Sequence, residues 1–132
     1  MREAGTGYHW GQTARLRAKR DWLGLSVEEM AAQMSKAAGR PLSKRSYQRM
    51  ESGENAIHES IWQTIEDMER SLGAAISALL QRVPKDATEH IVHMPADATG
   101  WHRQVIARAM HRDPRIVPKT DDDILAEQEM TG

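Results

Sequence analysis

Two short helices, joined by a basic segment, are predicted between Leu23 and Gly53, and they constrain the fold more than any other part of the chain. The first is expected over residues 27–35, because Ser26 can cap its first turn and Glu29 can bond back to the cap. Apolar residues then recur on one face at helical spacing. A helix of this kind buries one side, so it needs neighbours to pack against.

The second helix is expected over residues 44–51, with Ser43 as its N-cap and Gly53 as its end. Its apolar stripe consists of Leu42, Tyr47 and Met50. The residues off that stripe are Lys44, Arg45, Ser46, Gln48 and Arg49. Arg, Lys, Gln and Ser are the residue types that bond to base edges and phosphates in a major groove, so this face predicts contact with DNA.

The same residues resemble the helix-turn-helix domains of the Cro and phage-repressor type. The segment AKRDWLGLS is similar to the end of their first helix, and Met50-Glu51-Ser52-Gly53 to the close of their recognition helix. A narrower resemblance is to YdiL-like proteins and anti-CRISPR-associated autorepressors. It rests on Ser43, Arg45-Ser46-Tyr47-Gln48 and Glu51-Ser52-Gly53, covers about residues 12–83 and returns at Gly100-Trp101.

The resemblance implies a homodimeric transcriptional repressor of phage or mobile-element type, which places helix 44–51 of each subunit in the major groove of a palindromic operator. Autorepression is what the narrower resemblance implies. The residues expected to contact bases are Lys44, Arg45, Gln48 and Arg49. Those expected to make backbone or mixed contacts are Ser43, Ser46, Lys36, Arg40, Arg15 and Arg17. In the family, a Glu at the position of Glu51 pairs with an Arg late in the first helix, here Arg20, as a structural ion pair.

Charge is divided unevenly along the chain. Residues 1–56 hold ten Lys and Arg against six Asp and Glu, a net of +4, whereas residues 57–132 hold eight against thirteen, a net of -5. Residues 36–49 contain five basic residues and no acidic one. A local positive face suits phosphate attraction, although the ordinary alternative for such a cluster is a solvated helix face.

The basic segment 36–41 departs from the family, whose turn at this place is only a few residues long. Gly39 and Pro41 predict a loop. The insertion either loosens the angle between the two helices or adds Lys36 and Arg40 to the grip on the DNA backbone, and we favour the second.

A long helix is expected over residues 59–83, because apolar residues recur at steps of three and four until Pro84. Its second half needs a further surface, from a partner chain or from the C-terminal region. There the sequence predicts a strand at 89–94, a helix at 101–111 and a second strand at 115–117. These are too small to bury themselves. The residues assigned to dimerisation are Leu72, Ile76, Leu79, Ile91, Trp101 and Val105.

The expected fold is therefore mainly α: an N-terminal helix-turn-helix domain of four helices with a long fourth helix, plus a small α+β C-terminal dimerisation segment. The divisions are a flexible lead at 1–11, the DNA-binding domain at 12–83, the strand–helix–strand segment at 84–118 and an acidic tail at 119–132, either mobile or a frayed helix.

Other classes of function find less support in the sequence. There is no Cys, no Gly-rich phosphate loop and no nucleophile motif, so neither an enzyme nor a cofactor is expected. His90 and His93 would point to opposite faces of a strand, so no metal site is expected. With no apolar run of about 20 residues and no signal-peptide core, we expect a cytoplasmic, nucleoid-associated protein without a membrane span. RNA binding stays open, as does an antitoxin or adaptor-like module whose C-terminal half binds a partner protein.

Overall fold

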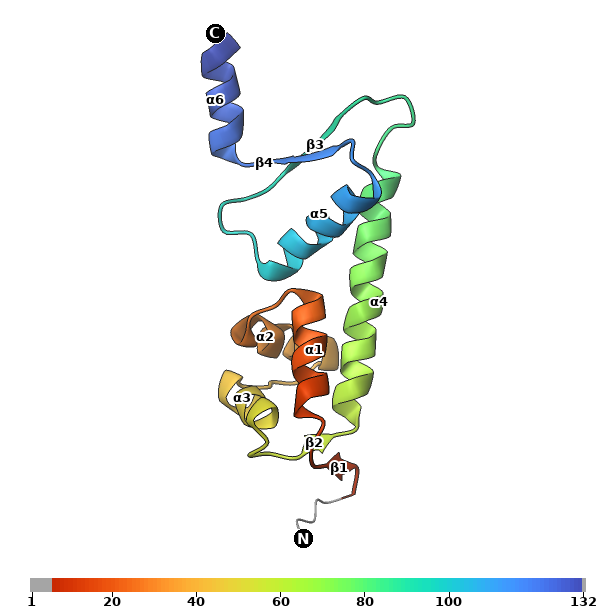
Figure 1. The fold of residues 1–132 in the computed structure, drawn as a ribbon, viewed down its shortest axis with the longest axis vertical. Helices are drawn as coiled ribbons and strands as arrows, with labels where there is room; N and C mark the ends of the chain where they lie inside the picture. Colours follow the sequence, from red (N-terminus) through yellow and green to blue (C-terminus); the bar gives the residue numbers. More distant parts are fainter. Residues whose placement is uncertain (1–5, 132) are drawn as a thin grey trace. The chain divides into compact units, whose positions relative to one another are not determined.

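Helices make up most of the computed structural model, which describes residues 6–131 (Figure 1). The helices are α1 (Thr13–Leu23), α2 (Val27–Ala38), α3 (Lys44–Ser52), α4 (Ser60–Gln81), α5 (Gly100–Arg112) and α6 (Asp121–Thr131). The strands are β1 (Tyr8–His9), β2 (Ile57–His58), β3 (His90–His93) and β4 (Ile116–Lys119). The chain divides into two compact units after Ser71, inside α4. The mainly helical class and the small β part agree with the sequence.

The starts of α2 and α3 and the end of α3 follow the signals in the sequence. Ser26 Oγ accepts the Glu29 N–H at 3.1 Å, and the Glu29 carboxylate accepts the Ser26 N–H at 3.1 Å, which is a complete capping box. Ser43 caps α3 by accepting the Ser46 N–H at 3.0 Å. Gly53 ends α3 with a φ of 84° in the left-handed region. Caps therefore fix α2 and α3 at the predicted starting residues.

The connection between α2 and α3 is shorter than predicted. Residues 36–38, assigned to a loop, continue α2 for almost one more turn, because Lys and Ala are strong helix formers. The helix ends only at Gly39, whose φ of 70° suits glycine and whose N–H bonds to Ser35 O. Ser35 Oγ then accepts the Leu42 N–H at 2.8 Å and ties the loop back to the helix.

The N-terminal lead is also more ordered than expected over the residues that the structure describes. Tyr8 and His9 form β1, which pairs antiparallel with β2 in the register Tyr8–His58 and His9–Ile57. The Glu59 N–H donates to Gly7 O at 2.6 Å and extends this pairing. Residues 1–5 of the predicted flexible lead lie outside the described part. Residues 7–9 are thus paired with the segment just before α4.

The core of the first unit consists mainly of side chains from α1 to α4, together with Leu25 and Ile57. Leu16, Leu23, Met30, Tyr47 and Ile65 have no exposed surface. Helix α3 contacts both α1 and α2. This packing supplies most of the stability of such short helices, since isolated helices of this length are marginal in water.

In the second unit, β3, α5 and β4 follow one another, and the two strands pair in parallel from His90–Ile116 to His93–Lys119. Strand β4 begins one residue later and ends two residues later than the predicted strand at 115–117. It includes Pro118, which a two-stranded sheet tolerates because each strand has an open edge. Arg115 stands before β4 and donates to the carbonyl oxygens of Pro84, Lys85 and Ala87 at 3.0–3.2 Å.

The acidic tail is helical from Asp121, so of the two expectations for it a helix is observed. Thr120 Oγ1 accepts the Asp123 N–H at 3.2 Å, and the Asp123 carboxylate accepts the Thr120 N–H at 2.9 Å. The three aspartates of the first turn lie at the positive end of the helix dipole. Sequence and capping chemistry together start this helix.

Three of the residues assigned to dimerisation are covered within the chain. Leu72, Ile76 and Leu79 are at most 9% exposed, so these side chains are not free for a partner, in contrast to the prediction. Ile91 is half exposed, whereas Trp101 and Val105 are partly exposed.

Among the helices of the described residues, none is long and apolar enough to cross a membrane.

Candidate nucleic-acid interface

Helix α3 is anchored by one face and presents the other to solvent. Tyr47 and Met50 are buried at 0% and 6% exposure. Lys44, Arg45 and Gln48 are exposed on the other side of the helix. Because the buried stripe anchors the helix, the backbone positions from which the cationic side chains extend are fixed.

The buried carboxylate of Glu51 gives α3 a second anchor, as predicted. Arg20 Nε donates to Glu51 Oε2 at 2.8 Å and Arg20 Nη2 to Oε1 at 3.2 Å, a bidentate pair. The same guanidinium donates to Leu25 O at 3.1 Å. Because Arg20 belongs to α1, the pair locks α3 against α1.

The electrostatics of this pair favour its charged form. Burial desolvates the Glu51 carboxylate and pushes its pKa up, but the hydrogen bonds from Arg20 and the charge of Arg17 outweigh that effect and lower the pKa below its ordinary value. The pKa of Arg20 is raised by its hydrogen bonds to Glu51. Burial likewise raises the pKa of the neighbouring Tyr47. Glu51 is therefore a structural anion beneath a basic helix face.

The outward cations of α3 differ in their surroundings. No ion pair in the described part of the chain involves Lys44 or Arg45. Arg49 Nε lies 3.8 Å from a Glu54 carboxylate oxygen, and both groups are exposed, so this contact is weak. Gln48 and Arg45 border a shallow hollow with Arg49. The four residues predicted to contact bases thus lie along one exposed strip of α3.

The hydroxyls of Ser43 and Ser46 are partly occupied. Ser43 Oγ accepts the Ser46 N–H and lies 3.0 Å from Ser46 Oγ. Both serines were expected to bond to DNA, and the structure gives Ser43 a capping role as well. Their positions at the start of α3 keep them beside Lys44 and Arg45.

The cations predicted on α1 lie on its surface with partners of their own. The Arg15 guanidinium stacks over the Trp62 ring at 4.1 Å and donates to the Gln12 side chain at 2.9 Å. Arg17 Nε lies 3.6 Å from a Glu51 oxygen, although its side chain is 61% exposed. The Arg15 guanidinium is thus held by two contacts, whereas that of Arg17 is mostly exposed and only loosely paired.

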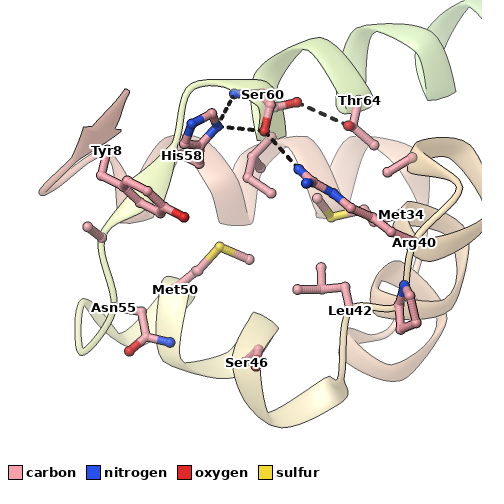
Figure 2. Close-up of a pocket in the computed structure, with 14 residues that line it drawn as sticks. Tyr8, Met34, Arg40, Leu42, Ser46, Met50, Asn55, His58, Ser60 and Thr64 are labelled. Atoms are coloured by element: carbon pink, nitrogen blue, oxygen red, sulfur yellow. Dashed lines mark hydrogen bonds between the residues drawn. The ribbon is translucent and has the colours of Figure 1, made fainter. Parts of the chain in front are cut away.

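Lys36 and Arg40, the two cations of the predicted insertion, are directed differently. Lys36 is exposed on the last turn of α2. The Arg40 guanidinium extends toward the start of α4, where Nη2 is 3.5 Å from Ser60 Oγ (Figure 2). The structure therefore does not bring Arg40 together with the exposed strip of α3.

Beneath Arg40 lies a cavity of about 460 Å³ that the sequence did not predict. Its fourteen lining residues come from β1, α2, the 40–42 loop, α3, the segment before α4 and the first turns of α4 (Figure 2). Met34, Met50 and Leu42 form its apolar side. His58, Ser60 and Arg40 form a polar side. No local motif could have revealed it, because it depends on segments more than 50 residues apart meeting in space.

A set of hydrogen bonds orders the polar side of the cavity. The Ser60 N–H donates to His58 Nδ1 at 3.1 Å, so Nδ1 is an acceptor and also receives the Ser60 hydroxyl at 2.7 Å. Thr64 Oγ1 donates to Ser60 O at 3.0 Å. Ser60 Oγ is then left with lone pairs for the Arg40 guanidinium.

Comparisons with known proteins add nothing to this geometry. No known family model matches the chain, and neither curated proteins nor solved structures include a match.

Proposed function

We propose that this protein is a sequence-specific DNA-binding regulator of the helix-turn-helix class, in which α2 and α3 form the motif and α3 enters the major groove. The observation that carries the proposal is α3 itself. Its buried face is fixed by Tyr47, Met50 and the Arg20–Glu51 pair, while its exposed face carries Lys44 and Arg45, which have no ionic partner among residues 6–131. An anchored helix that offers unpaired cations is suited to base readout.

In this proposal the exposed strip of α3 supplies sequence discrimination. Arg45 and Arg49 can each bond to guanine O6 and N7, and Gln48 can bond to adenine N6 and N7. Lys36, Arg15 and Arg17 surround the motif and contribute affinity through phosphates. The protein acts as a dimeric (auto)repressor on a palindromic operator, with the partly exposed Ile91, Trp101 and Val105 as the remaining predicted contacts between subunits.

Selection of bound sequences from a random double-stranded DNA library tests the proposal. We expect enrichment of a palindrome whose half-sites are about one helical turn apart. An Arg45→Ala, Arg49→Ala double variant should enrich nothing, whereas Arg82→Ala, Arg103→Ala, which removes two exposed arginines of the second unit, should recover the same palindrome. Failure of the natural chain to enrich any motif would contradict sequence-specific binding.

A second candidate function, an antitoxin or adaptor-like module that binds a partner protein, is supported by one observation. Ile91, Met110 and Leu125 of the second unit are 50%, 39% and 54% exposed. Light scattering after size exclusion separates the two uses of these side chains. A dimer that dissociates on Ile91→Asp substitution favours self-association, whereas a monomer leaves this surface for a different protein.

A further inference from the structure

We propose that the cavity between α2, α3 and α4 binds a small organic carboxylate with an apolar tail. The inference goes beyond DNA binding and does not depend on it. The cavity volume of about 460 Å³ lies within the range of about 300–1,000 Å³ that small-molecule sites occupy. It lies wholly within the first unit, so its walls belong to one compact body.

The apolar side of the cavity suits a flexible hydrocarbon tail. Met34 and Met50 are almost fully buried and face the space from α2 and α3 (Figure 2). Leu42 and Ile61 also line it. Methionine side chains adapt to irregular apolar shapes, so this side can accept a chain of methylene groups without fixed shape complementarity.

The positive charge of Arg40 favours an acidic headgroup on the ligand. Arg40 reaches over the cavity, and no acidic side chain is present among the fourteen lining residues. In the described part of the chain, the only hydrogen bond of the Arg40 side chain is the long one of 3.5 Å to the neutral Ser60 hydroxyl. A guanidinium whose partner is neutral and distant can exchange it for a carboxylate, which it binds through two parallel bonds.

The position of the cavity gives its occupant a mechanical role. Met50 and Ser46 contribute the α3 wall, directly behind the exposed strip. A molecule between α3 and α4 would contact both helices and fix their separation. Binding of a small acid in the cavity would therefore act directly on the position of α3.

Titration of the full chain with octanoate, followed by NMR of carbon-13-labelled methionine methyl groups, tests the site without any nucleic acid. We expect saturable shifts of the Met34 and Met50 signals and none at Met130, which is 88% exposed and outside the cavity. Acetate, which lacks the tail, should leave Met34 unshifted. Shifts confined to Met130, or acetate binding as tightly as octanoate, would overturn the proposal.

The headgroup is tested by comparing octanoate with 1-octanol. The natural chain should bind octanoate at least about tenfold more tightly, because only the carboxylate pairs with Arg40. Arg40→Gln should abolish that preference, and the matched variant Lys36→Gln, which removes an exposed cation nearby, should keep it. Equal affinity of the natural chain for acid and alcohol would refute the role of Arg40 even if the variant failed to fold.

The volume is tested from a tolerant helical position. Ala38 lies in the last turn of α2 and lines the cavity, so Ala38→Leu should fill it and prevent octanoate binding while leaving the helix intact. Unchanged octanoate binding by a folded Ala38→Leu chain would locate the ligand elsewhere and reject the cavity as its site.

Discussion

Helices α3 and α6 are both short and both carry several charged residues, yet they differ in how they are held. Helix α3 spans nine residues and buries Tyr47, Met50 and Glu51, whereas α6 spans eleven and has no buried residue over 121–130. The exposed charge of α3 is basic, and the opposite face of the helix is packed into the core. The charge of α6 is acidic and includes Asp121, Asp122 and Asp123 in one turn.

The difference shows that helical charge becomes a recognition surface only when the helix beneath it is fixed. Anchored side chains lose less freedom on binding and keep their spacing. Helix α6 depends on its cap and on the ion pair between Lys119 and the exposed Glu127. We therefore expect substitutions in α3 to change stability and binding, and substitutions in α6 to change mainly local order.

The largest effect is expected from removal of the anion beneath α3. Glu51→Ala leaves the Arg20 guanidinium, whose side chain is 21% exposed, without its bidentate partner. Loss of one member of a buried pair should lower the free energy of unfolding by about 3 kcal/mol. Urea unfolding followed by circular dichroism measures it.

The matched control lies in α6. Glu129→Ala removes an exposed carboxylate and should change the free energy of unfolding by no more than about 0.5 kcal/mol. Equal losses in the two variants would mean that α3 is no better anchored than α6.

The next effect concerns base readout. Arg45→Ala should weaken binding to the selected operator by about 1–3 kcal/mol while leaving affinity for scrambled DNA nearly unchanged, because a lost base contact affects only the cognate site. Fluorescence anisotropy on both DNAs measures this, with Asp122→Ala in α6 as the control that keeps the preference. Equal losses on both DNAs would reduce Arg45 to a phosphate contact.

A smaller effect should appear with pH. The folded-state pKa of Glu51 lies below the ordinary value of 4.5, so its contribution to stability is complete above that pH and disappears as the pH falls through the folded-state pKa. The difference in unfolding free energy between the natural chain and Glu51→Gln should therefore shrink between pH 6 and pH 3. A difference that does not change with pH would show that the charge of Glu51 is not what stabilises α3.

The smallest effect is expected from a cap in α6. Thr120→Ala and Ser43→Ala each remove one side-chain acceptor from the first turn of a helix, a loss of about 1 kcal/mol. Only the Ser43 variant should lower global stability, since α3 is part of the core. The Thr120 variant should instead speed amide hydrogen exchange within α6. Unchanged global stability of the Ser43 variant, or a loss of global stability in the Thr120 variant, would contradict this expectation.

Local signals account for what the sequence predicted well. Ser26, Ser43 and Gly53 stand where the caps were placed. Capping chemistry acts over three or four residues, so it is readable from the sequence. The Arg20–Glu51 pair was different, because its 31-residue separation was bridged only by the resemblance to a family.

Non-local contacts account for what the sequence missed. The β1–β2 pairing joins residues about 50 positions apart and consists of two residues on each side, too few for a periodic pattern. The direction of Arg40 depends on Ser60, which no local rule places beside it. The extra turn of α2 was missed for another reason: Gly39 was taken as part of a loop, although glycine also ends helices.

The glycines that end α1, α2 and α3 also make the protein sensitive to substitution at these three positions. Gly24, Gly39 and Gly53 all have φ between 70° and 84°, a conformation that among the other residues mainly Asn and Asp adopt without strain. Most amino-acid replacements at these three positions therefore place a strained residue at a helix end, so these positions should tolerate few residues other than glycine, asparagine and aspartate although they contact no ligand.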